Sequence, residues 1–173
     1  MALQAKGQGR SQERFPEPGH DHGPCLAHCV ARAEAAFEAR GLSLTPLRRQ
    51  VLLEIASTHA AIGAYEVLER LAGKHGRRLA PISVYRALDS LVDVGLVHRL
   101  ESRNAFFACH RQHVSHDDQR AALVCKHCAT VVEVPAGDVV AGLWKLAGKA
   151  GFLPGRIMIE VTGTCERCRG EAQ

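Results

Sequence analysis

Apolar positions in the first half of the chain recur with the spacing of amphipathic helices. Helices are predicted over residues 28–40, from residue 46 onward, over 64–75 and over 83–94. Thr45 can cap the second helix with Pro46 at its first position, Ser83 can cap the fourth, and a glycine follows the first, third and fourth. The first half is therefore predicted to be mainly helical.

Two shorter apolar runs follow these helices, Leu96–Leu100 and Ala105–Cys109. The four residues between them are polar, which predicts a β-hairpin with a four-residue turn. Three or four helices followed by a hairpin is the order of elements in a winged helix-turn-helix domain, a fold that binds DNA.

The second half changes character, to short strands around one helix. Strands are predicted at 123–125, 130–134 and 156–161, and a helix at 136–150. This order predicts a small α+β unit, joined to the first half near residues 103–110. The expected domains are a winged helix over 25–104, with hinge strands to about 110, and a C-terminal domain over 111–173. Residues 1–24 are too polar and too rich in Gly and Pro to bury a core, and are expected to form a disordered tail.

The net charge of +4 is concentrated in one segment. Residues 40–104 contain 10 Lys and Arg against 6 Asp and Glu, whereas the segments on either side are nearly neutral. A basic surface on the predicted winged helix is what binding to nucleic acid requires, although an ordinary solvated surface fits a charge of this size equally well.

No apolar run is long enough to cross a membrane, and the polar N-terminal residues lack the apolar core of a secretory signal. A cytoplasmic protein is therefore expected, in which the seven cysteines stay reduced and serve as metal ligands or nucleophiles. Ten histidines strengthen the metal interpretation. Five His and Cys residues near the N-terminus could also bind metal, or the two cysteines could simply lie on a helix: His20, His22, Cys25, His28 and Cys29.

Two Cys-x-x-Cys motifs, Cys125/Cys128 and Cys165/Cys168, give the clearest chemical signal. Each motif places two thiolates on one tight turn, and two such turns complete a tetrahedral zinc shell. The ion would join the start of the C-terminal domain to the end of the chain, as a structural cross-link. The alternatives are a redox dithiol or unrelated buried cysteines. A redox dithiol usually has a single motif, and a four-sulfur site leaves no position for an enzyme substrate.

A second group of candidate ligands is dispersed: His98 and Cys109 on the predicted hairpin and Glu133 on a C-terminal strand. The histidines just after Cys109 are His110, His113 and His116. One zinc ion could take ligands from both domains, which a metal-operated switch requires. The alternative is a surface histidine, a small buried cysteine and a solvated carboxylate.

The predicted fourth helix is the candidate DNA-reading element. Its apolar face would pack inward and leave Ser83, Tyr85 and Arg86 exposed at the N-terminal end, the end that usually enters the major groove. Arg reads guanine with two hydrogen bonds, and Tyr can contact a phosphate or a thymine methyl group. Tyr85 could instead complete the core.

Several segments and their order resemble the ferric uptake regulator family over residues 30–169: LTPLRRQVL, AYEVLERL, ISVYRALDSLVDVGLVHRLES and the Cys-x-x-Cys pair. The VYRAL segment ending in GLVH and the cysteine of FACH resemble its zinc-uptake-regulator branch in particular. The resemblance implies a homodimeric repressor that binds palindromic operator DNA when it is loaded with zinc and silences genes for zinc acquisition.

The resemblance also implies roles for individual residues. The implied structural zinc ligands are Cys125, Cys128, Cys165 and Cys168. The implied regulatory ligands are His98, Cys109, Glu133 and a histidine after Cys109, for which His116 is the best candidate and His113 a rival because the spacing here departs from the family pattern. This makes about two zinc ions per monomer. The implied DNA contacts are Tyr65 and Arg86 to bases and Thr45 and Arg48 to the backbone.

Iron, manganese and peroxide sensors of the same family use mostly His and carboxylate ligands, so the thiol of Cys109 favours zinc. A zinc-ribbon accessory protein or a redox protein would not explain the helix-and-hairpin half or its basic charge. The expected mechanism is a population shift, in which regulatory zinc selects the arrangement of two winged helices that fits DNA.

Overall fold

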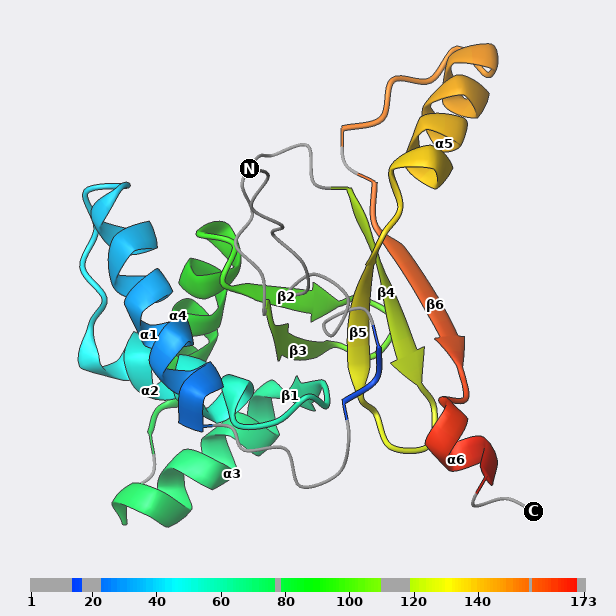
Figure 1. The fold of residues 1–173 in the computed structure, drawn as a ribbon. Coiled ribbons are helices and arrows are strands. Elements are labelled where there is room, and N and C mark those ends of the chain that lie inside the picture. Colours follow the sequence, from blue (N-terminus) through cyan, green and yellow to red (C-terminus); the bar gives the residue numbers. More distant parts are fainter. Residues whose placement is uncertain (1–13, 17–22, 77–78, 110–118, 156, 171–173) are drawn as a thin grey trace, which may run out of the picture. The chain divides into compact units, whose positions relative to one another are not determined.

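The computed structural model describes residues 14–16, 23–76, 79–109, 119–155 and 157–170 (Figure 1). The chain divides into two compact units, one of Pro18–His113 and one of Val114–Gln173 together with Met1–Glu17. Most of the predicted N-terminal tail lies outside the described residues. The first helix begins at Gly23, inside the range expected for that tail.

Helices and a small sheet make up the first unit. The helices are α1 (Gly23–Glu38), α2 (Pro46–Ala56), α3 (Ala64–His75) and α4 (Pro81–Asp93). Strands β2 (Val97–Leu100) and β3 (Ala105–Ala108) form an antiparallel hairpin, and β1 (Ile62–Gly63) pairs with the outer side of β3. The winged helix-turn-helix predicted from the apolar pattern is confirmed.

The ends of α2 and α3 follow the predicted signals. The Thr45 side chain accepts a hydrogen bond from the Arg48 N–H at 3.4 Å, and Pro46 follows at the first helical position. Gly76 ends α3 in the left-handed region, with φ of 66°.

The prediction that Ser83 caps α4 is wrong. The helix begins at Pro81, with Ala80 as the residue before it, so Ser83 lies inside the first turn. Proline has a fixed φ and no N–H to satisfy, and it can start a helix where no side-chain cap is present.

One apolar core joins the helices of the first unit to its hairpin. Its largest side chains are fully buried and come from every helix: Phe37, Leu52, Ile55, Leu71, Leu88 and Leu91. Burial of each such side chain contributes about 1.5–3 kcal/mol, so α4 is held firmly through its inner face. The buried carboxylate of Glu54 also ties α2 to α3, because Lys74 Nζ lies 2.6 Å from it.

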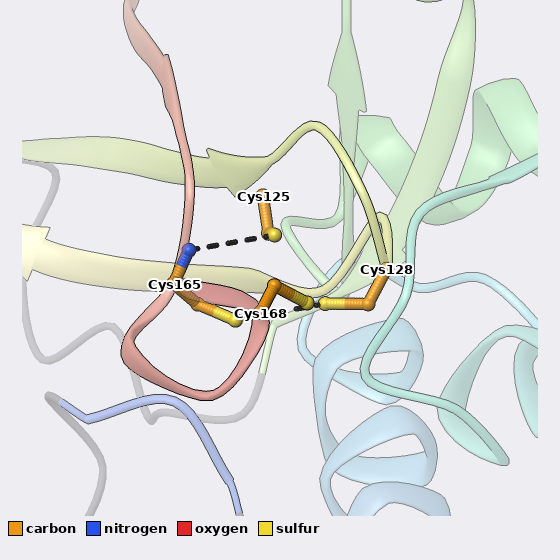
Figure 2. A group of neighbouring side chains, drawn as sticks. All are labelled: Cys125, Cys128, Cys165 and Cys168. Atoms are coloured by element: carbon orange, nitrogen blue, oxygen red, sulfur yellow. Dashed lines mark hydrogen bonds between the residues drawn. The ribbon is translucent and has the colours of Figure 1, made fainter. Parts of the chain in front are cut away.

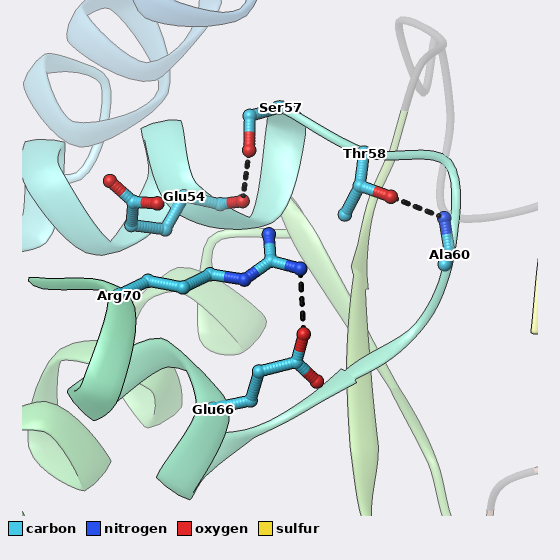
Figure 3. A network of polar contacts seen from close by, with 6 residues as sticks. All are labelled: Glu54, Ser57, Thr58, Ala60, Glu66 and Arg70. Carbon is cyan, nitrogen blue, oxygen red and sulfur yellow. Dashed lines mark hydrogen bonds and ion pairs between the residues drawn. The ribbon is translucent and has the colours of Figure 1, made fainter.

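A small polar network closes the turn between α2 and β1 (Figure 3). Ser57 Oγ donates to the Glu54 carbonyl at 2.7 Å, and Thr58 Oγ1 accepts from the Ala60 N–H at 3.0 Å. These bonds satisfy backbone groups at the end of α2, where the helix itself offers no partner. The turn leads the chain into β1, from which α3 starts directly; there Arg70 pairs with Glu66 one helical turn away.

In its described residues, the second unit contains a three-stranded sheet and two helices. Its elements are β4 (Arg120–Cys125), β5 (Val131–Pro135), α5 (Gly137–Lys149), β6 (Ile159–Gly163) and α6 (Glu166–Gly170). The strand order is β5-β4-β6, with β4 antiparallel to β5 and parallel to β6. The α+β prediction is confirmed, but β1 and α6 were missed because two and five residues are too few to show periodicity.

Helix α5 leaves most of its apolar side chains uncovered in the single chain. Among its residues, all of which are described, only Val140 is buried. Large apolar side chains are exposed on the helix and just after it: Val139, Leu143, Trp144, Leu146, Phe152 and Leu153. Such a surface indicates a protein–protein interface. Nowhere in the described residues is there a helix with the length and apolar character needed to cross a membrane.

Candidate metal centres and nucleic-acid interface

The four cysteines of the Cys-x-x-Cys motifs converge at one end of the second unit's sheet (Figure 2). Strands β4 and β6 are parallel neighbours, with Cys125 opposite Gly163, so their carboxyl ends lie side by side. β4 ends at Cys125, and Cys165 follows β6 after one residue. Cys168 lies on α6, so the second motif starts a short helix instead of forming only the expected tight turn.

The geometry of these cysteines, called the four-cysteine site below, fits a zinc ion. The four sulfurs lie within 4.8 Å of one another, and those of Cys128 and Cys165 are 3.9 Å apart. Two sulfurs of a tetrahedral zinc site with bonds of about 2.3 Å are separated by about 3.8 Å. Cys128 is half-buried and the other three are buried, so the shell is closed to most solvent.

Hydrogen bonds stabilise thiolate at one end of this site. Burial raises the pKa of the Cys125 thiol, but backbone hydrogen bonds from Cys128, Cys165 and His127 outweigh burial and lower the pKa to about 5. At Cys168, burial and the neighbouring thiols raise the pKa to about 12. The sulfurs therefore oppose one another's ionisation, and a divalent cation supplies the charge that lets all four ionise together.

Backbone hydrogen bonds close the first cysteine loop and join it to the end of β6. The Ala129 N–H donates to the Cys125 carbonyl at 3.0 Å, with Ala129 in the left-handed region at φ of 57°. The Lys126 N–H donates to the Gly163 carbonyl at 2.9 Å. Phe15, from the N-terminal segment of the same unit, packs against the buried cysteines. The sequence analysis missed Phe15 because nothing local links it to residues more than 100 positions away.

The hairpin of the first unit brings His98 and Cys109 together. His98 pairs with Phe107 across β2 and β3, and their ring centroids are 5.4 Å apart. Cys109 lies two residues after Phe107, so its side chain is on the same side of the hairpin as that of His98. A ring nitrogen of His98 and the Cys109 sulfur lie within 4.8 Å. The pair can provide two ligands of a mixed zinc site.

The other predicted regulatory ligands lie elsewhere in the chain. Glu133 is half-buried on β5 of the second unit, where Arg120 donates a hydrogen bond to its backbone carbonyl at 2.8 Å. His110, His113 and His116 lie outside the described residues. The predicted ligands therefore belong to both units and to the segment after Cys109.

The cysteines near the N-terminus lie on a helix, one of the two interpretations considered above. Cys25 and Cys29 are both on α1, and Cys29 is buried in the apolar core of the first unit. His28 is exposed on the same helix, whereas His20 and His22 lie outside the described residues.

Of the three residues on α4 that were predicted to be exposed toward DNA, Arg86 is exposed and Ser83 and Tyr85 are not. Ile82, which the sequence analysis did not single out, is 59% exposed at the N-terminal end. Ser83 is half-buried. Tyr85 is also half-buried and packs against the core, which agrees with the alternative that it completes the core.

The other predicted DNA contacts differ in how accessible they are. Tyr65 on α3 is 69% exposed, and Thr45 is exposed while it caps α2. Arg48 is half-buried: it donates to the Ser43 carbonyl at 2.7 Å, and its guanidinium lies 5.1 Å from the centre of the Phe37 ring. The Arg48 guanidinium therefore interacts with groups of its own unit, unlike the exposed side chain of Tyr65.

The chain is similar to known proteins over most of its length. The model of the ferric uptake regulator family matches residues 39–162. The zinc uptake regulation protein of Escherichia coli (strain K12) is 36% identical over 140 residues, which cover 80% of each chain. That of Mycobacterium tuberculosis (strain ATCC 25618 / H37Rv) is 32% identical over 136 residues, which cover 77% of this chain and 99% of the relative.

Two solved structures are similar as well. A zinc uptake regulator complexed with zinc and DNA has a TM-score of 0.78 at 35% identity, covering 86% of this chain and 98% of its own. The crystal structure of holo XcZur has a TM-score of 0.73 at 39% identity, covering 84% of this chain and 99% of its own.

Proposed function

Because this chain belongs to the ferric uptake regulator family, we propose that it is a zinc-responsive transcriptional repressor that binds operator DNA as a homodimer and controls zinc uptake genes. One observation carries the proposal: a zinc uptake regulator bound to zinc and DNA matches 86% of the chain with a TM-score of 0.78. The Cys109 thiol beside His98 supports zinc over iron or manganese, since thiolate ligands suit a borderline-soft ion.

The four-cysteine site holds a structural zinc ion. Its ligands are Cys125, Cys128, Cys165 and Cys168, which the ends of β4 and β6 bring together. A site with four protein sulfurs has no open position for substrate or water, so its contribution is to the fold. The second unit is small, and a metal cross-link compensates for its small core.

A second, regulatory zinc ion is bound by His98, Cys109 and Glu133, with a histidine after Cys109 as the fourth ligand. His116 is the first choice and His113 the alternative. The proximity of the His98 and Cys109 donor atoms supports this site. Together with the structural ion, this makes about two zinc ions per monomer. Because the ligands belong to both units, the regulatory ion couples zinc binding to the arrangement of the winged helix.

DNA is contacted by the winged helices of two chains. The N-terminal end of α4 enters the major groove, where Arg86 reads a base. Ser83 and Tyr85 are half-buried and contact the duplex through the parts of their side chains that stay accessible, and Tyr65 on α3 provides a further contact. Thr45 and Arg48 lie at the start of α2, where contacts with the sugar-phosphate backbone of DNA are expected. The exposed side chain of Arg49 is available to bind a DNA phosphate.

The second unit forms the dimer contact. Exposed apolar side chains on and after α5, Trp144 and Leu146 among them, become buried when a second copy covers them. Two reading helices must then lie about one helical turn of DNA apart on a palindromic operator.

Zinc acts by population shift in this mechanism. Without regulatory zinc the winged helices sample many orientations, and the ion stabilises those that fit DNA. A coupling free energy of about 1–3 kcal/mol at each site is enough to change operator occupancy, and DNA then tightens zinc binding by the same amount. The site of action is the cytoplasm, where operator DNA is found.

The proposal is tested by zinc-dependent DNA binding. A duplex is first selected from a random library with zinc-loaded protein, and its binding is measured by fluorescence anisotropy against buffered free zinc. We expect binding to appear with zinc and to weaken steeply with added salt. Binding that ignores zinc, or that follows iron or manganese instead, would contradict the proposed function.

A further inference from the structure

The backbone of Cys109 is fixed by two hydrogen bonds of different origin. Its N–H donates to the Leu96 carbonyl at 3.0 Å, which continues the pairing of β2 with β3. Its carbonyl accepts a bond from Arg32 Nη1 at 2.7 Å. Arg32 lies on α1, 77 residues earlier in the chain, so strand pairing does not require this second bond.

Helix α1 is a firm base for the Arg32 side chain. Ala33, the next residue, and Phe37 are fully buried in the core of the first unit. Arg32 itself is half-buried, so its bond to Cys109 is partly shielded from water. Hydrogen bonds from a charged donor are stronger than neutral ones, and partial burial limits competition from solvent.

The position of this bond matters because Cys109 comes directly after β3, which is paired along its length with β2. The sequence then continues to His113 and His116, the candidates for the fourth regulatory ligand. Holding both the N–H and the carbonyl restricts the backbone dihedral angles of Cys109, and the side chain that starts from this backbone places its sulfur within 4.8 Å of a His98 ring nitrogen.

We propose that Arg32 is a positioning residue for the regulatory zinc site, which keeps the Cys109 thiol facing His98 before zinc arrives. A ligand that is already oriented loses less conformational freedom when the metal binds, so zinc binds more tightly. This inference rests on the proposed function, because it requires zinc at Cys109. It also makes α1 part of the sensor, although α1 ends before the residues that the family model matches.

Arg40 provides a matched control for Arg32. It is the second residue after the end of α1, and its Nη1 donates to the Asp93 carbonyl at the end of α4. Both arginines therefore tie the α1 region to a backbone carbonyl of the same unit, but only Arg32 bonds to Cys109. Replacing Arg40 therefore measures how much a hydrogen bond of this kind contributes to the stability of the first unit, without any contact to Cys109.

The test compares full-length Arg32→Met, Arg32→Lys and Arg40→Ala proteins that retain structural zinc. Met keeps the length of the side chain and its tendency to form helix but donates no hydrogen bond, whereas Lys still donates. Zinc affinity at the regulatory site is measured by competition with a chelator of known affinity. We expect Arg32→Met to weaken it about tenfold, Arg32→Lys to recover part of the loss, and Arg40→Ala to leave it unchanged.

Cobalt bound in place of regulatory zinc supplies a second measurement. The sulfur-to-cobalt charge-transfer band reports whether the Cys109 thiolate is a ligand, and we expect this band to weaken in Arg32→Met but not in Arg40→Ala. Equal zinc affinities and equal bands in these two variants would overturn the role of Arg32. The Cys109→Ser variant separates the regulatory zinc site from the role of Arg32. If this variant keeps wild-type affinity for the regulatory zinc ion, the proposed regulatory site is wrong. If it loses that ion, the site stands and the Arg32 variants test the positioning role alone.

Discussion

The four-cysteine site and the His98–Cys109 pair differ in how much of a metal site one unit of the chain supplies. At the first, the parallel strands β4 and β6 end side by side and deliver all four sulfurs within the second unit. At the second, the hairpin register delivers two donor atoms within the first unit. A site that is complete within one unit can only hold that unit together, whereas a site that needs further ligands can control how parts of the molecule are arranged.

The two sites also differ in the chemistry of their donor atoms. Four thiolates bind zinc tightly enough to keep it through ordinary changes in free zinc. A mixed set of sulfur, imidazole and carboxylate binds less tightly, so its occupancy can follow the zinc supply. Under the proposed function, one protein uses the same ion as a permanent cross-link and as a signal.

The largest expected effect comes from breaking the four-cysteine site. Cys168→Ser removes one of four ligands, and the binding energy of such sites, about 10–16 kcal/mol, is folding energy for a small unit. We expect loss of the tight zinc ion and of cooperative unfolding in the second unit, measured by elemental analysis and circular dichroism. Cys29→Ala, a change at a buried cysteine of the first unit's core, is the control and should keep the tight zinc. A Cys168→Ser protein with full zinc and wild-type melting would remove the structural role.

Breaking the His98–Cys109 pair should give the opposite result. Cys109→Ser or His98→Ala should leave a folded dimer that keeps its tight zinc but has lost the coupling of about 1–3 kcal/mol per site between zinc and DNA. Operator binding measured by anisotropy against buffered zinc checks this. If Cys109→Ser binds operator with the wild-type zinc dependence, the switch does not operate through this pair.

The fourth regulatory ligand is distinguished in the same assay. His116→Ala should lose the zinc response as Cys109→Ser does, and His113→Ala should retain it. The reverse pattern would move the assignment to His113 and leave the rest of the site in place.

The four-cysteine site and the His98–Cys109 pair also show what the sequence could and could not predict. The four-cysteine site was predictable because each half of it is a local motif, and only the meeting of the halves depends on the sheet. The proximity of His98 and Cys109 follows from the hairpin register, because a four-residue turn fixes Phe107 opposite His98 and Cys109 lies two residues further on the same side.

Other features depend on contacts that no local pattern reveals. The bond from Arg32 to the Cys109 carbonyl joins residues 77 positions apart, and the packing of Phe15 on the cysteines spans an even longer separation. Arg48 was expected on the DNA surface by resemblance, but its guanidinium is engaged by Ser43 and the Phe37 ring. Sequence patterns identify elements and motifs, whereas the partner of a long side chain depends on how the elements pack.

A change on α4 tests whether DNA reading is separate from both metal sites. Arg86→Ala should cost about 1–2 kcal/mol of operator affinity and relax specificity at one base, while both zinc ions are retained. Arg49→Ala should weaken binding to all sequences and lower the salt dependence. Arg48→Ala should also lower the melting temperature, because its contact with Phe37 is lost. Unchanged discrimination between operator and random DNA in Arg86→Ala would show that α4 does not read the sequence.

The smallest expected effect concerns how well the four-cysteine site retains its ion. Phe15 packs against the buried cysteines, so Phe15→Ala should expose the sulfurs to water and to competing ligands without removing any of them. Loss of about 1 kcal/mol of apolar contact corresponds to about fivefold faster zinc release, which can be followed with a chromophoric chelator in stopped-flow mixing. Val161→Ala is the control, because Val161 belongs to the same unit, lies on β6 and is 49% exposed. Equal release rates in the two variants would show that Phe15 does not protect the site, and its packing there would have no role in keeping the structural ion in place.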